Sequence, residues 1–345
     1  LLWSKVIDRK EHIVKSFEED KAIGLKERGI DLIKGEAVFT SESSIKVNNA
    51  TFTADKFVLA LGSKAARPPI PGIEHTISST DALNLRELPK SILIIGGGVI
   101  ALEFSHIFAS VGVDVTIVEM TDRLLSGEDE DSSRYIQNIS EKIGINILLN
   151  SQVTKINVNE TQKTVEVKIS GEKVDIEVEQ VMLAAGRIPN TDGLGLRDIG
   201  VQVEKSGIRV NEYLQTSVNH IYAGGDGIGG YMLTPVASYE GRMASRNAIK
   251  GNAEKVDYSL VTRTTFTHPP IASIGLTEEK AKEKGFSYET NRLNFKDVGA
   301  AVVLGETDGF VKILYDKEDK KLIGAHIIGA RAEELIHEFC NRYER

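Results

Sequence analysis

Glycines and small apolar residues are concentrated in one short segment of the chain, Gly96-Gly97-Gly98-Val99-Ile100-Ala101. The segment follows an apolar run at 92–95 with the composition of a buried strand, and it opens a run typical of a helix. In this context a GxGxxA pattern predicts a pyrophosphate-binding turn: Gly96 makes the tight turn, Gly98 lets the backbone approach the phosphates, and Ala101 lets helix pack on strand. A glycine-rich turn that binds no ligand is the alternative.

A carboxylate closes the next apolar run along the chain. Glu119 follows the run at 115–118 and stands 23 residues after Gly96. This is close to the ~20 residues expected for the acid that receives the 2′-hydroxyl of an adenosine ribose. A carboxylate here repels a 2′-phosphate, so Glu119 favours NAD over NADP. Nearby Arg123 leaves NADP open, and a solvated glutamate at a strand end is the ordinary alternative.

A second group of glycines ends another apolar run. Residues 219–223 are followed by Gly224, Gly225 and Asp226. The glycines permit a ligand to approach the backbone closely, and the Asp226 carboxylate can accept a hydrogen bond from a polyol. Taken alone, this pattern is explained equally well as a plain turn.

The order of the predicted elements indicates an α/β protein with more than one domain. Strand and helix alternate strictly at 92–95, 99–110, 113–118 and 129–143, which predicts right-handed βαβ units in a parallel sheet. A small sheet and one buried strand are expected within 37–60, a β-meander at 150–178 and a buried strand at 181–186. Five strands and two helices from Tyr258 onward suit an α+β domain.

Composition and charge exclude several classes of partner. The 345 residues contain 42 Lys and Arg against 50 Asp and Glu, a net charge of −8, which leaves no basic surplus for nucleic acid. The one cysteine, Cys340, excludes an intramolecular disulfide framework. The first ~30 residues form neither a signal peptide nor an apolar span, so we expect no membrane association and a cytoplasmic location.

The histidines do not have the spacing of metal ligands, and we expect no metal site. Five of them are expected to be structural: His12, His75, His106, His220 and His326. His337 has Glu333 and Glu334 one turn before it, and a solvated helix is favoured over a metal-binding face.

Six motifs, in matching order and spacing, resemble the pyridine nucleotide-disulfide oxidoreductases and, among these, dihydrolipoamide dehydrogenase. The motifs are Ala60-Leu61-Gly62-Ser63, GGGVIALE at 96–103, AAGRIPN at 184–190, AGGD at 223–226, MLTPVASYEG at 232–241 and FTHPPIASIGLTE at 266–278. The resemblance extends throughout the chain. It implies the cofactors FAD and NAD.

The resemblance assigns roles to residues at the matching positions. Contacts with FAD are implied for the backbone near Ala37 and for Ala60, Leu61, Gly62 and Ser63. Asp226 binds the ribityl chain, and Met232, Leu233, Thr234 and Pro235 lie beneath the flavin ring. Contacts with NAD are implied for the glycine turn, Val153 and Gly186, and Glu103 lies near the nicotinamide. Thr234-Pro235 departs from the Ala-His pair usual in dihydrolipoamide dehydrogenases and looks nearer to some mercuric reductases.

The family's redox machinery is not found in this sequence. Its first glycine loop, for the FAD pyrophosphate, and its Cys-x4-Cys disulfide are expected upstream of Leu1, and its catalytic His-Glu dyad beyond Arg345. His268-Pro269 is not that dyad, and we expect it on a strand. No residue of this chain is therefore assigned a catalytic role.

The resemblance also implies a domain order and a function. Residues 1–90 are expected to belong to an FAD-binding domain, 91–189 to bind NAD, 190–256 to return to the FAD-binding domain and 257–345 to form an interface domain. The strands at 310–314 and 322–328 are expected to supply a homodimer surface. The implied reaction passes electrons from a dithiol, a lipoyl group, through a disulfide and FAD to NAD. A mercuric reductase-like or transhydrogenase-like flavoprotein and a truncated, non-catalytic nucleotide-binding protein are the alternatives.

Overall fold

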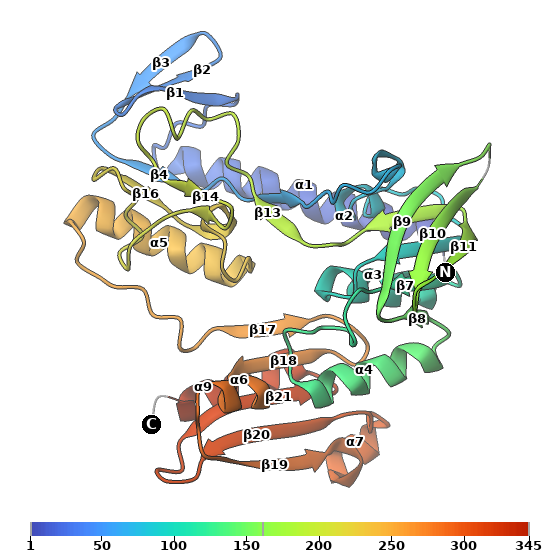
Figure 1. Cartoon of the computed structure of the whole chain (residues 1–345). Helices are drawn as coiled ribbons and strands as arrows, with labels where there is room; N and C mark the ends of the chain where they lie inside the picture. The colour runs from blue at the N-terminus through green and yellow to red at the C-terminus, as the bar shows by residue number, and fades with distance from the viewer. Residues whose placement is uncertain (1, 161, 344–345) are drawn as a thin grey trace. The chain divides into compact units, whose positions relative to one another are not determined.

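In the described chain, segments far apart in the sequence come together in two units (Figure 1). The computed structural model describes residues 2–160 and 162–343. Residues 67–186 and 258–343 form the first unit, and residues 2–66 and 187–257 form the second. The first unit holds the predicted nucleotide-binding elements. The predicted division into domains at 90, 189 and 256 stays a prediction.

A four-stranded parallel sheet with the order β12-β6-β7-β8 is the centre of the first unit. Its strands are β6 (Ser91–Ile95), β7 (Asp114–Val118), β8 (Asn146–Leu148) and β12 (Gln180–Leu183). The crossover helices are α3 (Val99–Ser110) and α4 (Glu130–Lys142). Both faces of β6 are covered, and Ile92, Leu93 and Ile94 are completely buried, as expected of a central parallel strand. The predicted βαβ alternation is confirmed.

The ends of α4 show why this helix forms where the sequence predicts it. Asp129 is the N-cap and accepts a hydrogen bond from the N–H of Asp131, and the first turn is acidic, which suits the positive end of the helix dipole. The helix stops at Ile143, and Gly144 follows with a φ of +91°.

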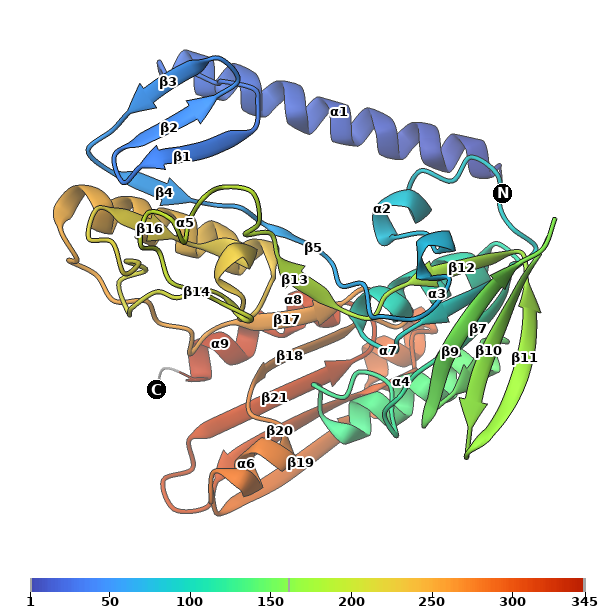
Figure 2. The ribbon, with the colours of Figure 1, turned by 45° about the horizontal axis from the view of Figure 1, so that its top comes forward.

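An antiparallel meander covers one face of the parallel sheet. It consists of β9 (Ser151–Val158), β10 (Lys163–Ile169) and β11 (Glu172–Val178), in the order β11-β10-β9 (Figure 2). Val153, Val165 and Val167 form one apolar cluster with Leu93 and Val181 of the parallel sheet. Two short helices, η1 (Ile73–His75) and α2 (Ser79–Ala82), precede β6.

The C-terminal part of the first unit is a five-stranded antiparallel sheet, in the order β17-β18-β21-β20-β19. The strands are β17 (Thr262–Thr265), β18 (Ile271–Gly275), β19 (Tyr288–Asn294), β20 (Phe310–Asp316) and β21 (Leu322–Ile328). In its described residues this part has short helices η3 (Phe295–Asp297), α6 (Glu278–Glu283), α7 (Gly299–Leu304), α8 (Ala332–Leu335) and α9 (His337–Tyr343). The prediction of two helices was wrong, because helices of one or two turns leave little periodicity in a sequence.

One further expectation about this sheet was wrong. His268-Pro269 lies in the turn between β17 and β18 rather than on a strand. The strands β20 and β21 were expected to supply a dimer surface, and this stays a prediction. Phe310, Leu314 and Ile327 are completely buried within the chain itself, so any such surface is left to the other residues of these strands.

The second unit brings two separate segments into one core. From the first segment come α1 (Trp3–Glu27), the antiparallel sheet β1 (Ala37–Ser41), β2 (Ser44–Val47) and β3 (Ala50–Thr53), and then β4 (Phe57–Leu59) and β5 (Ser63–Ala65). From the second come β13 (Arg187–Pro189), β14 (Val203–Glu204), β15 (Gly207–Ile208), β16 (Ile221–Ala223), η2 (Gly225–Ile228) and α5 (Thr234–Lys250). β4 pairs in parallel with β16, and β5 pairs antiparallel with β13.

A buried histidine joins three elements of the first unit. The Nδ1 atom of His106, on α3, accepts a hydrogen bond from the backbone N–H of His268 (3.3 Å), and Nε2 lies 3.0 Å from the Ser140 hydroxyl of α4. Ser140 donates its own proton to the Ile136 carbonyl, so Nε2 carries the imidazole proton. Burial, together with the charge of His268, lowers the pKa of His106 to about 4, and the ring is neutral at pH 7.

His106 makes the stability of the fold depend on pH. The unfolded chain binds a proton at this imidazole below about pH 6.5, while the folded chain does so only below about pH 4. Stability is therefore lost as the pH falls through this window, by about 2 kcal/mol at pH 5. Urea unfolding at pH 7 and pH 5 tests this. The His106→Gln protein should lose less stability than the wild type, and the exposed His75→Gln control should follow the wild type. Parallel losses in all three proteins would contradict the assignment.

Candidate functional site

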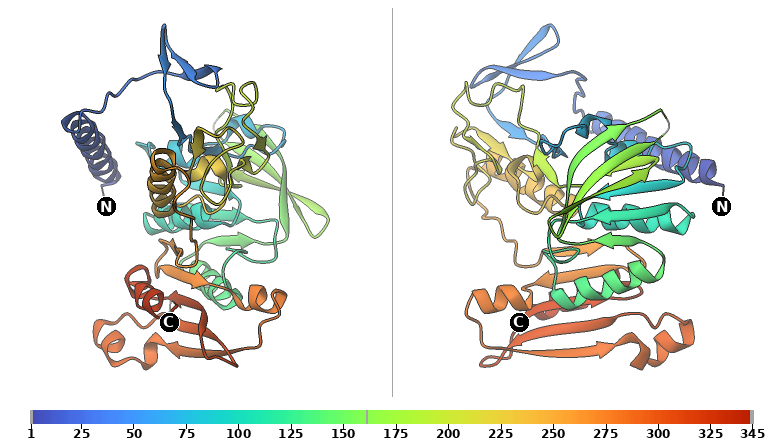
Figure 3. Two further views of the ribbon diagram at one scale, coloured as in Figure 1. Left: turned by 90° about the vertical axis from the view of Figure 1, so that its left-hand side faces the viewer. Right: turned by 45° about the vertical axis from the view of Figure 1, so that its right-hand side comes forward.

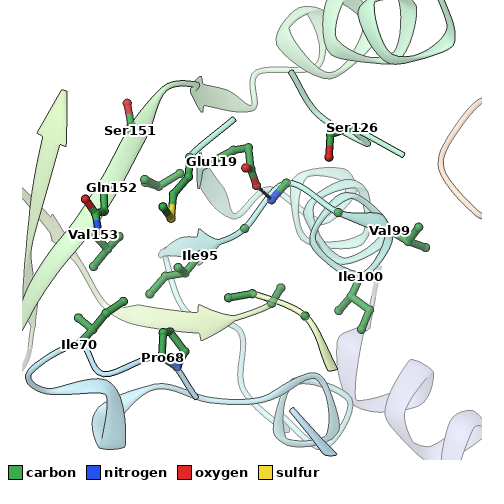
Figure 4. Close-up of a pocket in the computed structure, with 18 of the residues that line it drawn as sticks. Pro68, Ile70, Ile95, Val99, Ile100, Glu119, Ser126, Ser151, Gln152 and Val153 are labelled. Atoms are coloured by element: carbon green, nitrogen blue, oxygen red, sulfur yellow. Dashed lines mark hydrogen bonds between the residues drawn. The ribbon is translucent and has the colours of Figure 1, made fainter. Parts of the chain in front are cut away.

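The carboxyl ends of neighbouring parallel strands open onto one pocket of the first unit. The pocket has a volume of about 640 Å³ (Figure 4). It is lined by Pro68, Pro69, Ile70, Ile95, Gly96, Gly97, Gly98, Val99, Ile100, Val118, Glu119, Met120, Ser126, Ser151, Gln152, Val153, Ala184, Ala185 and Gly186. In open parallel sheets this edge is where ligands bind, at the point where the strand order changes direction.

Two glycines make the turn after β6 possible. Gly96 has a φ of +109°, and a Cβ atom at this position would lie 2.5 Å from the Ala184 carbonyl oxygen. A Cβ atom on Gly97 would lie 2.9 Å from Glu119 Cγ and 2.9 Å from Leu124 Cδ2. The absence of side chains is therefore what lets the turn pass between β12 and the acid at the end of β7.

The third glycine faces open space at the start of a helix. Gly98 is the N-cap of α3, and a Cβ atom there would meet no protein atom within 4 Å. No side chain caps the helix, so the first N–H groups of its twelve residues point outward with the positive end of the helix dipole. An anionic group can accept hydrogen bonds at this position.

Glu119 is held at the pocket by the backbone around it. Its Oε2 accepts a hydrogen bond from the Gly97 N–H (2.5 Å), which Figure 4 shows as a dashed line. Its Oε1 accepts hydrogen bonds from the N–H (2.7 Å) and hydroxyl (2.8 Å) of Thr121. Each carboxylate oxygen has a further lone pair, so the acid can still accept hydrogen bonds from a ligand's hydroxyl groups.

The structure brings most of the residues predicted for NAD to this pocket. These are Gly96, Gly97, Gly98, Val99, Ile100, Glu119, Val153 and Gly186. Ala101 is a residue of α3 whose side chain is completely buried in the core, and it does not line the pocket. Glu103 also lies outside the lining. Its Oε1 accepts a hydrogen bond from the Phe266 N–H (2.9 Å), and burial raises its pKa despite this bond.

Several lining residues were not predicted from the sequence. Pro68, Pro69 and Ile70 lie in a proline-rich connection that carries none of the six motifs, and Ser151 and Gln152 were expected only as part of the meander. Ser151 and Gln152 directly precede the predicted Val153. Ala184 and Ala185 follow β12, the parallel neighbour of β6, so the strand order would have indicated them had it been known.

Arg123 does not contribute to the lining of the pocket. One of its terminal nitrogen atoms donates to Glu279 Oε2 (2.6 Å) and to the Ser126 carbonyl (3.2 Å). The arginine that left NADP open in the sequence is therefore paired with a carboxylate of the five-stranded-sheet region.

In the second unit, the structure joins three of the motifs through hydrogen bonds. The Ser63 hydroxyl donates to Asp226 Oδ2 (2.5 Å), and Arg187 donates to the hydroxyl (2.7 Å) and carbonyl oxygen (2.7 Å) of Ser63. The segments carrying Ser63 and Asp226 follow the parallel strands β4 and β16, so both lie at the same edge. This edge also includes Leu61, which lies against Gly227.

The other residues predicted for FAD lie elsewhere in the second unit. Met232 has a φ of +50°, Leu233 is the N-cap of α5, and Thr234 and Pro235 begin that helix. Gly225 donates its N–H to the buried Glu240 of the same helix (2.6 Å). Ala37 begins β1, in the small antiparallel sheet. The ligand contacts of all these residues stay predictions.

Within residues 2–160 and 162–343, no group of three or more His, Cys, Asp and Glu residues could hold a metal ion. Within the same residues, no helix has the length and apolar character needed to cross a membrane.

A parallel sheet, an uncapped helix after a glycine turn and an acid on the next strand define a dinucleotide-binding protein of the Rossmann type. Residues 3–241 match the family model described as pyridine nucleotide-disulphide oxidoreductase, and residues 261–344 match the dimerisation domain of the same family. The chain belongs to the pyridine nucleotide-disulphide oxidoreductase family. Proteins of this family use FAD and NAD(H) as cofactors.

The relatives include two kinds of enzyme. A mercuric reductase of Staphylococcus aureus is 37% identical over 338 residues, which cover 97% of this chain and 62% of that protein. A dihydrolipoyl dehydrogenase of Geobacillus stearothermophilus is 35% identical over 342 residues, which cover 97% of this chain and 73% of that protein. The chain thus spans less than two thirds of the mercuric reductase's length.

A solved structure has the same fold over nearly the whole chain. It is the HOCl-induced flavoprotein disulfide reductase RclA from Escherichia coli, with a TM-score of 0.90 and 30% sequence identity. The match covers 99% of this chain and 79% of RclA. The mixed α/β fold predicted from the sequence is confirmed.

Mutations of two glycines of the turn should affect stability and NADH binding to different degrees. Gly96→Ala should lower stability by about 1–3 kcal/mol or more, because of its positive φ and the clash with Ala184. Gly98→Ala should lower the melting temperature much less than Gly96→Ala, because its backbone is ordinary and the space is open, yet it should weaken NADH binding. Thermal melting and NADH fluorescence titration measure both effects. Wild-type affinity in Gly98→Ala would show that no ligand approaches this backbone.

Proposed function

We propose that this chain is part of a flavoprotein oxidoreductase of the dihydrolipoamide dehydrogenase type, with NAD bound in the pocket at the end of β6. The observation that carries the proposal is the meeting of the glycine turn, the open N-terminus of α3 and Glu119 around one pocket. Its volume of about 640 Å³ lies within the usual range for cofactor sites.

The residues of the pocket suit the separate parts of a dinucleotide. The backbone N–H groups after Gly98 would hold the pyrophosphate, and Glu119 would accept the hydroxyl groups of the adenosine ribose. A 2′-phosphate would meet the Glu119 carboxylate, while Arg123, the arginine that follows Glu119 in the sequence, is paired with Glu279. NAD is therefore favoured over NADP. On the other side of the turn, Gly186 and Val153 would line the path toward the nicotinamide.

The second unit supplies part of a flavin site. Asp226 would accept hydrogen bonds from the ribityl hydroxyl groups. Ser63, itself held by Arg187, would fix the carboxylate in place. The residues 60–62 and 232–235 would contact the flavin, as the family resemblance implies. FAD supplies the electron transfer between dithiol and nicotinamide, and the protein's part is binding and orientation.

The dithiol chemistry needs groups beyond these residues. Cys340 is the one cysteine of the sequence, so the family's redox disulfide is not supplied by the 345 residues. We propose a lipoyl-type dithiol as substrate of the whole protein, a homodimer through the region matching the dimerisation domain, and a cytoplasmic location.

A mercuric reductase-like function is the second candidate. The Thr234-Pro235 pair favours it, because these residues replace the Ala-His pair usual in dihydrolipoamide dehydrogenases. The sequence identities of 37% and 35% to the two kinds of relative do not separate them.

The test of the proposed function is a titration with NADH and NADPH. The wild-type chain should bind NADH more tightly than NADPH. Glu119→Gln should weaken NADH binding about tenfold, because a charged acceptor is lost at the ribose. The ratio of the Kd for NADPH to the Kd for NADH should therefore fall. Glu172→Gln, an exposed change on β11, is the control and should match the wild type. The absence of NADH binding in the wild type would contradict the proposal.

A further inference from the structure

The loop that follows Glu119 is tied to the five-stranded sheet by charged side chains. This segment, residues 120–129, is called the acid loop here, and it connects the end of β7 to the start of α4. Its Arg123 forms an ion pair with Glu279 of α6 (2.6 Å). Two further carboxylates at the end of the loop, Glu128 and Asp129, are both buried, with 8% and 1% of their surface exposed.

Glu128 binds two strands of the sheet at once. Its Oε1 accepts a hydrogen bond from Nε of Arg263 on β17 (2.9 Å), and its Oε2 accepts one from the hydroxyl of Ser273 on β18 (2.6 Å). Ser273 is 1% exposed, so this contact is shielded from water. The strands β17 and β18 are themselves paired, with Arg263 directly opposite Ser273. Both oxygens of the carboxylate are therefore held by one rigid hairpin.

Asp129 takes part in a second buried group around Lys312 of β20. The Lys312 ammonium lies 2.8 Å from Asp129, 2.8 Å from Asp131 and 2.5 Å from Glu278. Burial works against the charge of this lysine, but the hydrogen bonds to the three carboxylates outweigh it and raise its pKa. Because Asp129 is also the N-cap of α4, the same ammonium holds both the end of the loop and the start of the helix.

The other end of the acid loop reaches the glycine turn. Leu125 donates its backbone N–H to the Gly97 carbonyl (2.9 Å), and Gly97 donates its own N–H to Glu119. Leu124 and Leu125 are 0% and 4% exposed, and Met120 and Ser126 line the pocket. Because Glu128 donates its own N–H to the Leu125 carbonyl (2.8 Å), the loop connects the dinucleotide pocket to the sheet through an unbroken series of hydrogen bonds.

Apolar packing alone already joins α4 to the five-stranded sheet. Ile136 and Ile139 of α4 pack in one cluster with Ile271, Phe310 and Ile328, and the right-hand view of Figure 3 shows the green helix lying along the orange sheet. Buried ion pairs cost desolvation energy and often add no net stability, but they fix which groups meet and at what distance. In this structure the buried ion pairs lie at the end of the acid loop, which begins directly after Glu119.

We propose that Arg263 and Lys312 are positioning residues for dinucleotide binding: the five-stranded sheet holds the acid loop, and through it Glu119 and the glycine turn, in the binding conformation. This inference rests on the proposed NAD site. By linkage, NADH bound in the pocket must in turn stabilise the contacts between the acid loop and the sheet.

The main experiment compares Arg263→Gln with Arg263→Lys in the full chain. Arg263→Gln should raise the Kd for NADH about fivefold, because Glu128 loses its cation and the loop its fixed position. Arg263→Lys should recover part of the affinity. Amide hydrogen exchange of residues 120–128 should be faster in Arg263→Gln than in the wild type. NADH should slow this exchange in the wild type more than in the variant.

Matched variants separate positioning from a general loss of stability. Arg134→Gln breaks an exposed ion pair with Glu130 on α4 and should leave the Kd for NADH and the exchange of residues 120–128 unchanged. Ser273→Ala removes one hydrogen bond to Glu128 with little change of volume, and it should weaken NADH binding even if Arg263→Gln does not fold.

The outcomes of these measurements are distinct. A lower melting temperature with wild-type NADH affinity and wild-type exchange in residues 120–128, in either Arg263→Gln or Ser273→Ala, would reduce these contacts to a structural role and overturn the inference. If the wild-type chain itself does not bind NADH, the proposed function fails instead.

Discussion

The close approach of three backbone segments at the end of β6 is the constraint on which the site depends. The turn after Ile95 passes between the carbonyl of Ala184 and the side chain of Glu119, and at Gly96 and Gly97 this passage leaves no room for a Cβ atom. A methyl group at Gly96 would meet the backbone after β12, and one at Gly97 would displace the side chains of Glu119 and Leu124 beside the pocket. The three glycines thus have different roles: two allow the fold to close, and the third leaves space for a ligand.

The buried charges of the first unit depend on the same arrangement. A carboxylate such as Asp129, at 1% exposure, is stable in its charged form only where a cation and N–H groups reach it. The five-stranded sheet provides that cation from Lys312. The region that matches a dimerisation domain therefore has an internal task as well, because it neutralises carboxylates that belong to the nucleotide-binding part of the chain.

Local patterns in the sequence were sufficient to predict the helices and strands around the dinucleotide pocket. They were not sufficient to predict contacts between residues that are far apart in the sequence. The limits of α3 and α4 could be predicted because a glycine turn, an Asp N-cap and a terminal glycine mark them. The motifs also indicated Glu119 and Asp226. The pairing of Arg123 with Glu279 joins residues 156 positions apart, and no local pattern carries that information. The same holds for Pro68 and Pro69, whose place in the pocket depends on the packing of a connection that carries no binding motif.

The second unit has a consequence for how the chain folds during synthesis. Its strand β4 pairs with β16, and Phe39 donates its N–H to the carbonyl of Leu194, so these contacts form only after the ribosome has made a further stretch of roughly 120 residues. At ordinary rates of translation this delay is on the order of ten seconds. During that time the intervening residues 67–186, which carry the parallel sheet and its glycine turn, can collapse first. Until then, Phe39 and Leu59 lack the part of their apolar core that residues 196–223 supply.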